Sequence, residues 1–211
     1  MSRFPDPRST PGDQPLARGG DLEPATLLDA YTRGIFPWPG PDGTVFWWSP
    51  DPRAVLPLDG LHISRSLRRT LRSERFRGTR DTAFSAVVAA CADRPGHGTW
   101  ITPAMAGAYA RLHRLGHAHS VEVWGPDEQL VGGVYGVTVG AAFMGESMFH
   151  RADDASKVAL VHLVEHLRDR GFALFDVQLP TPHLARMGAV EVARDAYLER
   201  LAVAVTRPAA W

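Results

Sequence analysis

Apolar residues recur at helical spacing in several separate segments of this chain. Residues 24–34 (PATLLDAYTRG) carry a proline near the start and a glycine just past the end, as helices prefer. The same spacing predicts helices over residues 82–94, 103–116 and 155–171, and a short one around 183–187. These segments indicate a globular chain with several amphipathic helices.

Apolar runs between these helices predict strands. Three runs, at 119–124, 128–139 and 141–149, are joined by tight-turn residues and predict an antiparallel meander. Further strands are expected at 45–48 and 172–179, and a last strand followed by a helix at 189–205. This order predicts an α/β or α+β fold with a mixed sheet.

Turn-rich segments divide the chain. The sequences SPDPR and PLDG precede residue 61, so we expect a small N-terminal domain over 1–60 and a larger domain over 61–211. The first twenty residues are rich in proline, glycine and polar side chains, and are expected to be loosely ordered.

Residues 31–53 (YTRGIFPWPGPDGTVFWWSPDPR) hold three of the six tryptophans among several prolines. Because proline removes backbone donors, this segment is expected to be neither a simple helix nor a central strand. A rigid loop that presents aromatic faces would suit a planar ligand such as a nucleobase. The alternative, equally supported, is that these rings form the core of the small domain.

Composition narrows the class of protein. Hydrophobic residues make up 45% and charged residues 22%, as in ordinary globular proteins. The single cysteine, Cys91, forms no intramolecular disulfide and excludes a thiolate metal cluster. With no apolar run suited to a signal peptide or membrane span, we expect a cytosolic protein with no membrane partner.

Charge is unevenly distributed although the formal net charge is zero. Arginine is concentrated between residues 65 and 80, and Arg65, Arg68, Arg69 and Arg72 share one face of a predicted helix. A solvated helix face is one interpretation. Because acidic partners at helical spacing are missing, we favour a site for nucleic-acid phosphates.

Candidate chemistry lies on two predicted strands. Glu146 occurs in GESMF, and Asp176 and Gln178 occur in FDVQ, where alternate residues share a face. Carboxylates in apolar strands are costly to bury unless they are paired or functional. The alternative is that one of them forms an ion pair with an arginine such as Arg151.

Histidine patterns are not expected to bind a metal. His162, Glu165 and His166 match an inverted zinc-peptidase motif, but helical spacing places them on the solvent side. His113 and His119, with His117 between them, have no neighbouring carboxylate in the sequence, so packing or surface roles are expected.

The order of elements resembles the Gcn5-related N-acetyltransferases. Members of that family bind the acetyl-CoA pyrophosphate at a Gly-rich turn, whereas the corresponding turn here, FHRADDASKV, has two aspartates and no glycine. This departure counts against an acetyl-CoA-dependent enzyme, so we expect no cofactor.

Longer motifs resemble the bacterial leucyl/phenylalanyl-tRNA–protein transferases. The resemblance runs in order through GGDL (19–22), AYTRGIFPW, FWWSPDPRAVLP, LHISRSL, GTWIT, LGHAHSVEVW, LVGGVYGV, GESMF, ASKVAL and FDVQ. It implies a small N-terminal domain and a larger acetyltransferase-like domain. It also implies transfer of leucine, phenylalanine or, less well, methionine from aminoacyl-tRNA to proteins that begin with Arg or Lys.

The resemblance also assigns roles to residues. Asp176 and Gln178 match the catalytic positions, and Asp176 is expected to orient the Gln178 amide. Glu146 and Asp176 would attract the basic side chain of the acceptor. For the oligomeric state, we favour a monomer. The aminoacyl-adenosine site would be formed by Tyr31, Trp38, Trp100, Phe143 and Leu163. At position 163 a relative has an aromatic residue, so one wall of the pocket differs here. A non-catalytic RNA-binding module remains the main alternative outside enzymes.

Overall fold

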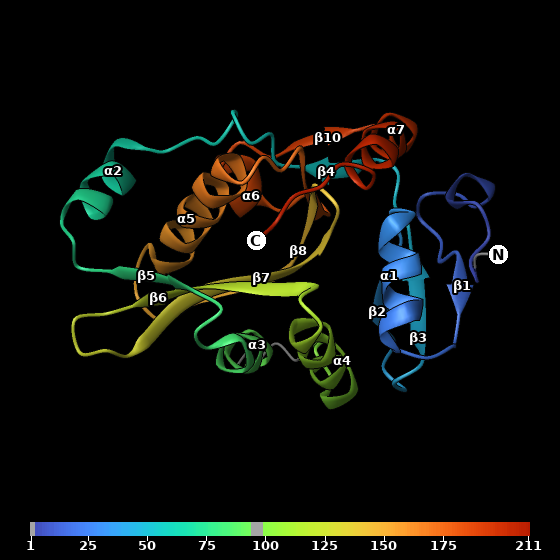
Figure 1. Ribbon diagram of the computed structural model, residues 1–211, viewed down its shortest axis with the longest axis horizontal. Helices are drawn as coiled ribbons and strands as arrows, with labels where there is room; N and C mark the ends of the chain where they lie inside the picture. Colours follow the sequence, from blue (N-terminus) through green and yellow to red (C-terminus); the bar gives the residue numbers. More distant parts are fainter. Residues whose placement is uncertain (1–2, 94–98) are drawn as a thin grey trace.

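The computed structural model of the protein describes residues 3–93 and 99–211, which form two sheets covered by helices (Figure 1). The helices are η1 (Pro7–Ser9), α1 (Pro24–Thr32), α2 (Arg65–Arg72), α3 (Phe84–Ala92), α4 (Pro103–Arg114), α5 (Ala155–Asp169), α6 (Pro182–Arg186) and α7 (Arg194–Ala204). The strands are β1 (Ala17–Arg18), β2 (Phe36–Pro39), β3 (Val45–Trp48), β4 (Arg53–Val55), β5 (Arg77–Arg80), β6 (Ala118–Trp124), β7 (Leu130–Val139), β8 (Ala142–His150), β9 (Leu174–Gln178) and β10 (Val190–Val192).

The large sheet has seven strands in the order β10-β4-β9-β8-β7-β6-β5. Strands β6, β7 and β8 form the predicted antiparallel meander. Helix α5 then crosses over to β9, which pairs with β8 in parallel. The predicted mixed α/β fold class is confirmed, and the meander, helix and parallel strand follow the order noted in the sequence.

Helices cover both faces of the large sheet. Figure 1 shows α5 on one face and α3 and α4 on the other, with α1 and the small sheet at one end of the molecule. Two apolar cores result, one between the sheet and α5, and one that joins α3 and α4 to α1 and the small sheet. The second core places the N-terminal segment directly beside the large sheet.

The tryptophan- and proline-rich segment forms a β-hairpin. β3 is the central strand of the three-stranded sheet β1-β3-β2, so the expectation of no central strand is wrong. The prolines are compatible because Pro37 and Pro39 lie on the edge strand β2, while β3 contains none. Trp47 is buried and belongs to the core, whereas Trp38 is 38% exposed. The interpretation of these rings as core therefore holds for Trp47, whereas the Trp38 ring stays partly exposed.

Residues 3–20 pack on the small sheet, contrary to the loosely ordered segment that was predicted. The Phe4 ring lies 4.7 Å from that of Trp47, centroid to centroid. β1 pairs with β3, and the Trp47 indole Nε1 donates to the Gly19 carbonyl at 2.8 Å. Ring packing, strand pairing and this hydrogen bond together anchor a segment that is rich in proline, glycine and polar side chains.

The predicted division between residues 60 and 61 does not coincide with the change of sheet. β4 precedes that division, yet it pairs with β9 and β10 of the large sheet. The small sheet ends with β3 at Trp48. We propose that two domains, one over the small sheet and one over the large sheet, meet at residues 49–52.

A β-bulge interrupts the pairing of β7 with β8. Tyr135 pairs with Ser147 and Gly136 pairs with Gly145, which leaves Glu146 as an extra residue on β8. A Cβ atom on Gly136 would lie 2.2 Å from the Met144 carbonyl oxygen. The close approach of the two strands at the bulge therefore requires glycine at position 136.

Gly136→Ala is expected to lower the free energy of unfolding by about 1–3 kcal/mol, because β7 and β8 must separate to admit the methyl group. Urea unfolding followed by circular dichroism measures this change. Gly107→Ala on α4 is the control, because its Cβ would meet only Arg111 Nη1 at 3.8 Å. The control should be neutral or stabilising by up to about 1 kcal/mol. Equal midpoints for Gly136→Ala and the unaltered protein would contradict the constraint.

Candidate active site

A cavity of about 1230 Å³ lies between the small sheet and the ends of β8 and β9. The parallel pairing of these strands stops at Met144 and Asp176, so the later residues of each strand are free to line the gap. Glu146 and Gln178 both line it. The sequence-predicted carboxylate and amide thus reach one cavity from two different strands.

Trp38 and Trp100 form an aromatic pair on the wall of this cavity. Their ring centroids are 5.1 Å apart with an interplanar angle of 22°, so the rings are stacked. Trp100 also meets the Tyr109 ring edge to face at 6.4 Å. Two of the residues expected at the aminoacyl-adenosine site are therefore neighbours, although 62 residues separate them in the sequence.

Two buried phenols hold the Glu146 carboxyl group. The Tyr31 hydroxyl donates to Oε1 at 2.8 Å, and the Tyr109 hydroxyl donates to Oε2 at 2.7 Å. Burial raises the pKa of both tyrosines well above the ordinary value, so both phenols remain protonated donors. Tyr31 was predicted to line the adenosine site, but it instead lies behind Glu146.

Glu146 takes up a proton more readily than an ordinary glutamate. Burial is the main cause that raises its pKa to about 7, against the opposing effect of the phenol hydrogen bonds, while the charge of Asp176 adds to the increase. The two phenol oxygens are also 3.0 Å apart. The Tyr31 hydroxyl, the Tyr109 hydroxyl and the Glu146 carboxyl group thus make three oxygen–oxygen contacts, but the two phenols supply only two hydrogens. A proton on Glu146 supplies the third hydrogen.

Gln178 is held at both its backbone and its side chain. Its Nε2 donates to Glu146 Oε1 at 2.8 Å, and its backbone N–H donates to Asp176 Oδ1 at 2.9 Å. The backbone is left-handed, with φ of +66°. Such a conformation costs of order 1–3 kcal/mol and is found where the surrounding structure over-determines it, often at functional sites.

Asp176 is fully buried in an ion pair with Arg53. Arg53 Nε and Nη2 donate to the two carboxylate oxygens at 2.9 and 2.6 Å, and the Tyr197 hydroxyl donates to Oδ2 at 2.8 Å. Burial alone would lower the pKa of the Arg53 guanidinium, but the Asp176 charge, together with Tyr197, the hydrogen bonds to Asp176 and the charge of Glu146, outweighs burial and raises this pKa above the ordinary value. Arg53 also donates to the Gly34 carbonyl at 3.0 Å.

These contacts change two roles expected from the sequence. Glu146, rather than Asp176, holds the Gln178 side-chain amide, and Asp176 fixes the backbone of Gln178 instead. The ion pair considered for the two carboxylates forms between Asp176 and Arg53, whereas Arg151 lies near Asp93. Because its charge is taken up by Arg53, Asp176 is not available to an acceptor side chain.

Phe143 and Leu163 do not line the cavity. Both are fully buried in the core between the sheet and α5. Position 143 precedes the bulge at Glu146, which shifts the alternation of side chains along β8. The apolar residues that line the cavity are instead Val134, Met148, Phe175, Val177 and Leu184.

Tyr109, Arg53 and Tyr197 are site residues that the sequence did not reveal. Tyr109 occurs at regular apolar spacing in α4 and resembles any core aromatic. Arg53 lies in a turn-rich segment 123 residues before its partner. The only available signal was an arginine that immediately follows the tryptophan-rich hairpin.

The arginine face of α2 has the expected exposure. Leu67 is buried, while Arg65, Arg68, Arg69 and Arg72 are exposed. Within the described residues these four guanidinium groups form no ion pair. α2 lies at the end of the molecule opposite the small sheet (Figure 1). The structure therefore does not bring these arginines to the cavity.

The histidines depart from their expected surroundings. His166 is 7% exposed and its ring meets that of Trp211, so the prediction that it faces solvent is wrong. The helix is covered there because the C-terminal segment packs against it. Asp81 lies beside His113 and His119, although the sequence showed no neighbouring carboxylate.

Two models of an enzyme family that transfers aminoacyl groups match this chain. Residues 55–202 match the family model of leucyl/phenylalanyl-tRNA protein transferase, and residues 20–51 match that of its N-terminal domain. The chain belongs to the leucyl/phenylalanyl-tRNA–protein transferase family, as its motifs indicated.

Similar proteins bear the family name. The chain is 59% identical over 189 residues to the leucyl/phenylalanyl-tRNA–protein transferase of Aromatoleum aromaticum, which covers 89% of this chain and 79% of that protein. It is 56% identical over 208 residues to the one from Anaeromyxobacter sp. (strain K), covering 97% and 89%.

Solved structures align more weakly. L-PGS from Bacillus licheniformis aligns over 76% of this chain and 52% of that chain, with a TM-score of 0.44 and 11% identity. A GCN5-related N-acetyltransferase from Kribbella flavida aligns over 81% and 61%, with a TM-score of 0.44 and 10% identity. In the part of the chain described, no helix is both long and apolar enough to cross a membrane.

Glu146 is expected to make stability depend on pH. In the unfolded chain its carboxyl group loses its proton near pH 4.5, whereas in the folded protein it keeps the proton up to about pH 7. The stability it contributes is fully present below pH 4.5 and is lost as the pH rises to about 7. We expect this loss to amount to about 1–3 kcal/mol.

Glu146→Gln removes the titrating group and tests this expectation. Urea unfolding between pH 4 and 8 should show the unaltered protein losing about 1–3 kcal/mol relative to the variant as the pH rises. Glu199→Gln, at an exposed position of α7, is the matched control and should run parallel to the unaltered protein. A Glu146→Gln curve that also runs parallel would show that the carboxyl group titrates normally.

Proposed function

We propose that this chain transfers leucine, phenylalanine or, less well, methionine from aminoacyl-tRNA to proteins that begin with Arg or Lys. The product would be marked for degradation by the N-degron pathway. The observation that carries this proposal is that one cavity holds both a tryptophan pair and the linked Glu146 and Gln178, in a member of this family. We infer a monomeric cytosolic enzyme, which suits the single buried cysteine.

The reaction is the aminolysis of an ester. The α-amine of the acceptor attacks the carbonyl carbon of the aminoacyl ester, so a C–N bond forms and the C–O bond to the ribose breaks. The amine loses a proton, and the ribose oxygen gains one as it leaves. Because the ester is already activated, the transfer needs neither a nucleotide nor a cofactor.

Gln178 positions the attacking amine. Since its Nε2 is engaged by Glu146, its carbonyl oxygen is the atom left to accept a hydrogen bond from the α-amine. An amide is a poor base, so this contact aligns the amine rather than removing its proton. An α-amino group has a pKa of about 7.7–8.0, so a useful fraction is already neutral near pH 7.

Glu146 has two roles, because it holds the Gln178 amide and also binds the acceptor protein. Asp176 is paired with Arg53, which leaves Glu146 as the carboxyl group that can face the basic side chain of the acceptor. A cation in the cavity would favour the ionised form of Glu146 and release its proton. Asp176 supports the reaction indirectly, because it holds the backbone that carries the Gln178 side chain.

The donor would occupy the aromatic and apolar walls. A base between Trp38 and Trp100 needs about 7 Å between the rings, twice a normal contact, so it would have to separate the stacked pair. The apolar wall around Met148, Phe175 and Val177 suits an apolar side chain. Such walls separate substrates that differ by one methylene by only about 10–200-fold, in keeping with several accepted amino acids.

The arginine face of α2 would bind the tRNA away from the cavity. Arg65, Arg68, Arg69 and Arg72 can each contact a phosphate, because each is exposed and none is paired within the described part of the chain. Phosphate contacts give affinity that is independent of sequence and falls as salt is added.

Transfer of labelled leucine from Leu-tRNA to a peptide that begins with Arg tests the function directly. Product is expected with this peptide and with a Lys peptide, and not with a matched peptide that begins with Ala. A parallel reaction with acetyl-CoA should yield no acetylated peptide. Acetyl transfer alone would instead identify an acetyltransferase, and tight tRNA binding without transfer would identify a binding module.

Gln178→Asn tests the positioning role. Asparagine tolerates the left-handed backbone and keeps an amide, but one methylene less withdraws that amide from Glu146 and from the amine. We expect kcat/KM for leucine transfer to fall about 100-fold while the unfolding midpoint is unchanged. Gln129→Asn, at an exposed turn position, should retain full activity. Normal turnover by Gln178→Asn would remove Gln178 from the mechanism.

A further inference from the structure

A cluster of metal-binding side chains lies outside the cavity. In the described ranges, Asp81, His113 and His119 are the one group of three such residues whose ligand atoms all lie within 4.8 Å of one another. Asp81 directly follows β5, His113 lies in the last turn of α4, and His119 is near the start of β6. None of them lines the cavity described above.

His119 lies between two acceptor oxygen atoms. Its Nε2 lies 3.2 Å from the Gly116 carbonyl oxygen, and its Nδ1 lies 2.7 Å from Asp81 Oδ2. Two arrangements suit the closer contact: either Nδ1 donates a hydrogen to the carboxylate, or a cation lies between Nδ1 and the carboxylate.

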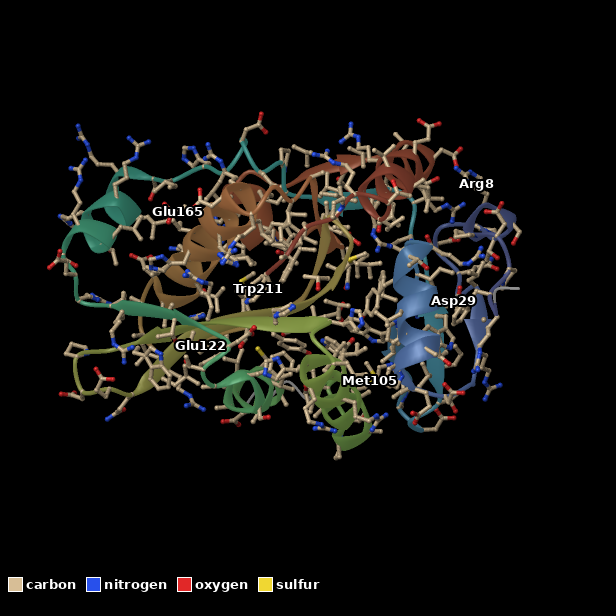
Figure 2. All side chains as sticks on the ribbon, viewed as in Figure 1. Arg8, Asp29, Met105, Glu122, Glu165 and Trp211 are labelled. Atoms are coloured by element: carbon tan, nitrogen blue, oxygen red, sulfur yellow. The ribbon has the colours of Figure 1, made fainter. Side chains whose placement is uncertain are left out.

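Several features favour the second arrangement. A metal-bound histidine commonly donates its other ring N–H to a backbone carbonyl, as His119 Nε2 does here to Gly116. Asp81 Oδ1 accepts from the Ser120 N–H at 2.8 Å, which fixes the carboxylate. The rings are also held flat, His119 against Trp211 at 4.5 Å and His113 against Phe84 at 4.2 Å. Figure 2 shows Trp211 between α5 and the sheet.

Two of the distances between ligand atoms would each change by about 0.6 Å on metal binding. Ligand atoms at about 2.0–2.2 Å from a tetrahedral ion lie about 3.3 Å from one another. The Nδ1 to Oδ2 distance of His119 and Asp81 would open from 2.7 Å, and the His113 Nδ1 to Asp81 Oδ1 distance would close from 3.9 Å. His113 Nδ1 now donates to the Ala118 carbonyl, so this proton would move to Nε2.

We propose that Asp81, His113 and His119 form a binding site for a divalent transition-metal ion, with zinc as the best match. Two imidazoles and one carboxylate are ligands that zinc accepts, and three protein ligands leave a fourth position for water. On binding, His119 Nδ1 coordinates the ion through its lone pair, and any proton it carried passes to solvent.

The bound ion would join three segments that meet at this point. It ties the residue after β5 to the end of α4 and the start of β6. Tyr109, which holds Glu146, lies one helical turn before His113 on α4. The ion would therefore anchor the helix that supports the cavity, without contacting substrate.

The test uses the full chain, free of any histidine tag and stripped of metal with a chelator. Titration with Co²⁺ should give saturable visible absorption at one equivalent, and Zn²⁺ should displace it. At 100 times its dissociation constant, Zn²⁺ should raise Tm by about 5–10 °C. Absence of saturable binding to the folded protein would overturn the proposal.

Variants locate the site. Because loss of an outer hydrogen-bond partner already weakens metal binding about 10–100-fold, Asp81→Asn and His119→Gln should weaken it about 100-fold or more. His117→Ala is the matched control, because His117 lies between the two ligands in sequence but outside the cluster, and it should bind as the unaltered protein does.

Circular dichroism of each variant checks that it is folded. Should one ligand variant not fold, the other still decides the outcome. Binding that survives in a folded Asp81→Asn or His119→Gln protein would place the metal elsewhere and sink the proposal. Loss in His117→Ala alone would do the same.

Discussion

The buried ion pair between Arg53 and Asp176 is the constraint on which the arrangement of the site depends. Two charges taken out of water cost several kcal/mol each, and only close geometry with every remaining hydrogen bond made offsets that cost. Here the offset comes from four elements: β9 carries Asp176, β4 carries Arg53, α7 brings Tyr197, and the end of α1 offers the Gly34 carbonyl. The position of β9 is therefore fixed by the neighbouring strand β4, by α7 and by the segment after α1, and Gln178 takes its position from β9.

A second constraint places Glu146. As the extra residue of a bulge it has no partner on β7, and its side chain lies on the same face of β8 as Met144, toward two phenols on α1 and α4. The carboxyl group then shares hydrogens with both phenols and with the Gln178 amide. The two constraints converge on one amide, whose backbone is held by Asp176 and whose side chain is held by Glu146. Neither carboxyl group needs to act on substrate chemically for the site to depend on it.

Local patterns predicted most of the secondary structure, because helical and strand periodicities are encoded by neighbouring residues. β4 and β5 were missed because Arg53 and the run Arg77–Arg80 are polar, and only pairing with distant strands makes them strands. Glu146, Gln178, Trp38 and Trp100 were found at the cavity from their motifs. Arg53 and Tyr109 were not, since a buried arginine or a hydrogen-bonding tyrosine is recognised only through a partner far along the chain. The role expected of Phe143 came from the family resemblance, whereas in the structure its ring packs against those of Phe175 and Trp211 on the α5 side of the sheet.

The ion pair between Arg53 and Asp176 also limits when the site can form during synthesis on the ribosome. Arg53 lies 123 residues before Asp176 and 144 residues before Tyr197, so its partners are synthesised long after it. At about 5–20 residues per second, ribosomal synthesis leaves the guanidinium without them for roughly 7–29 s. During that interval the hairpin that holds Trp38 can form from nearby residues alone, but the strand that carries Gln178 does not yet exist. A nascent chain would thus display its aromatic surface well before it could catalyse anything.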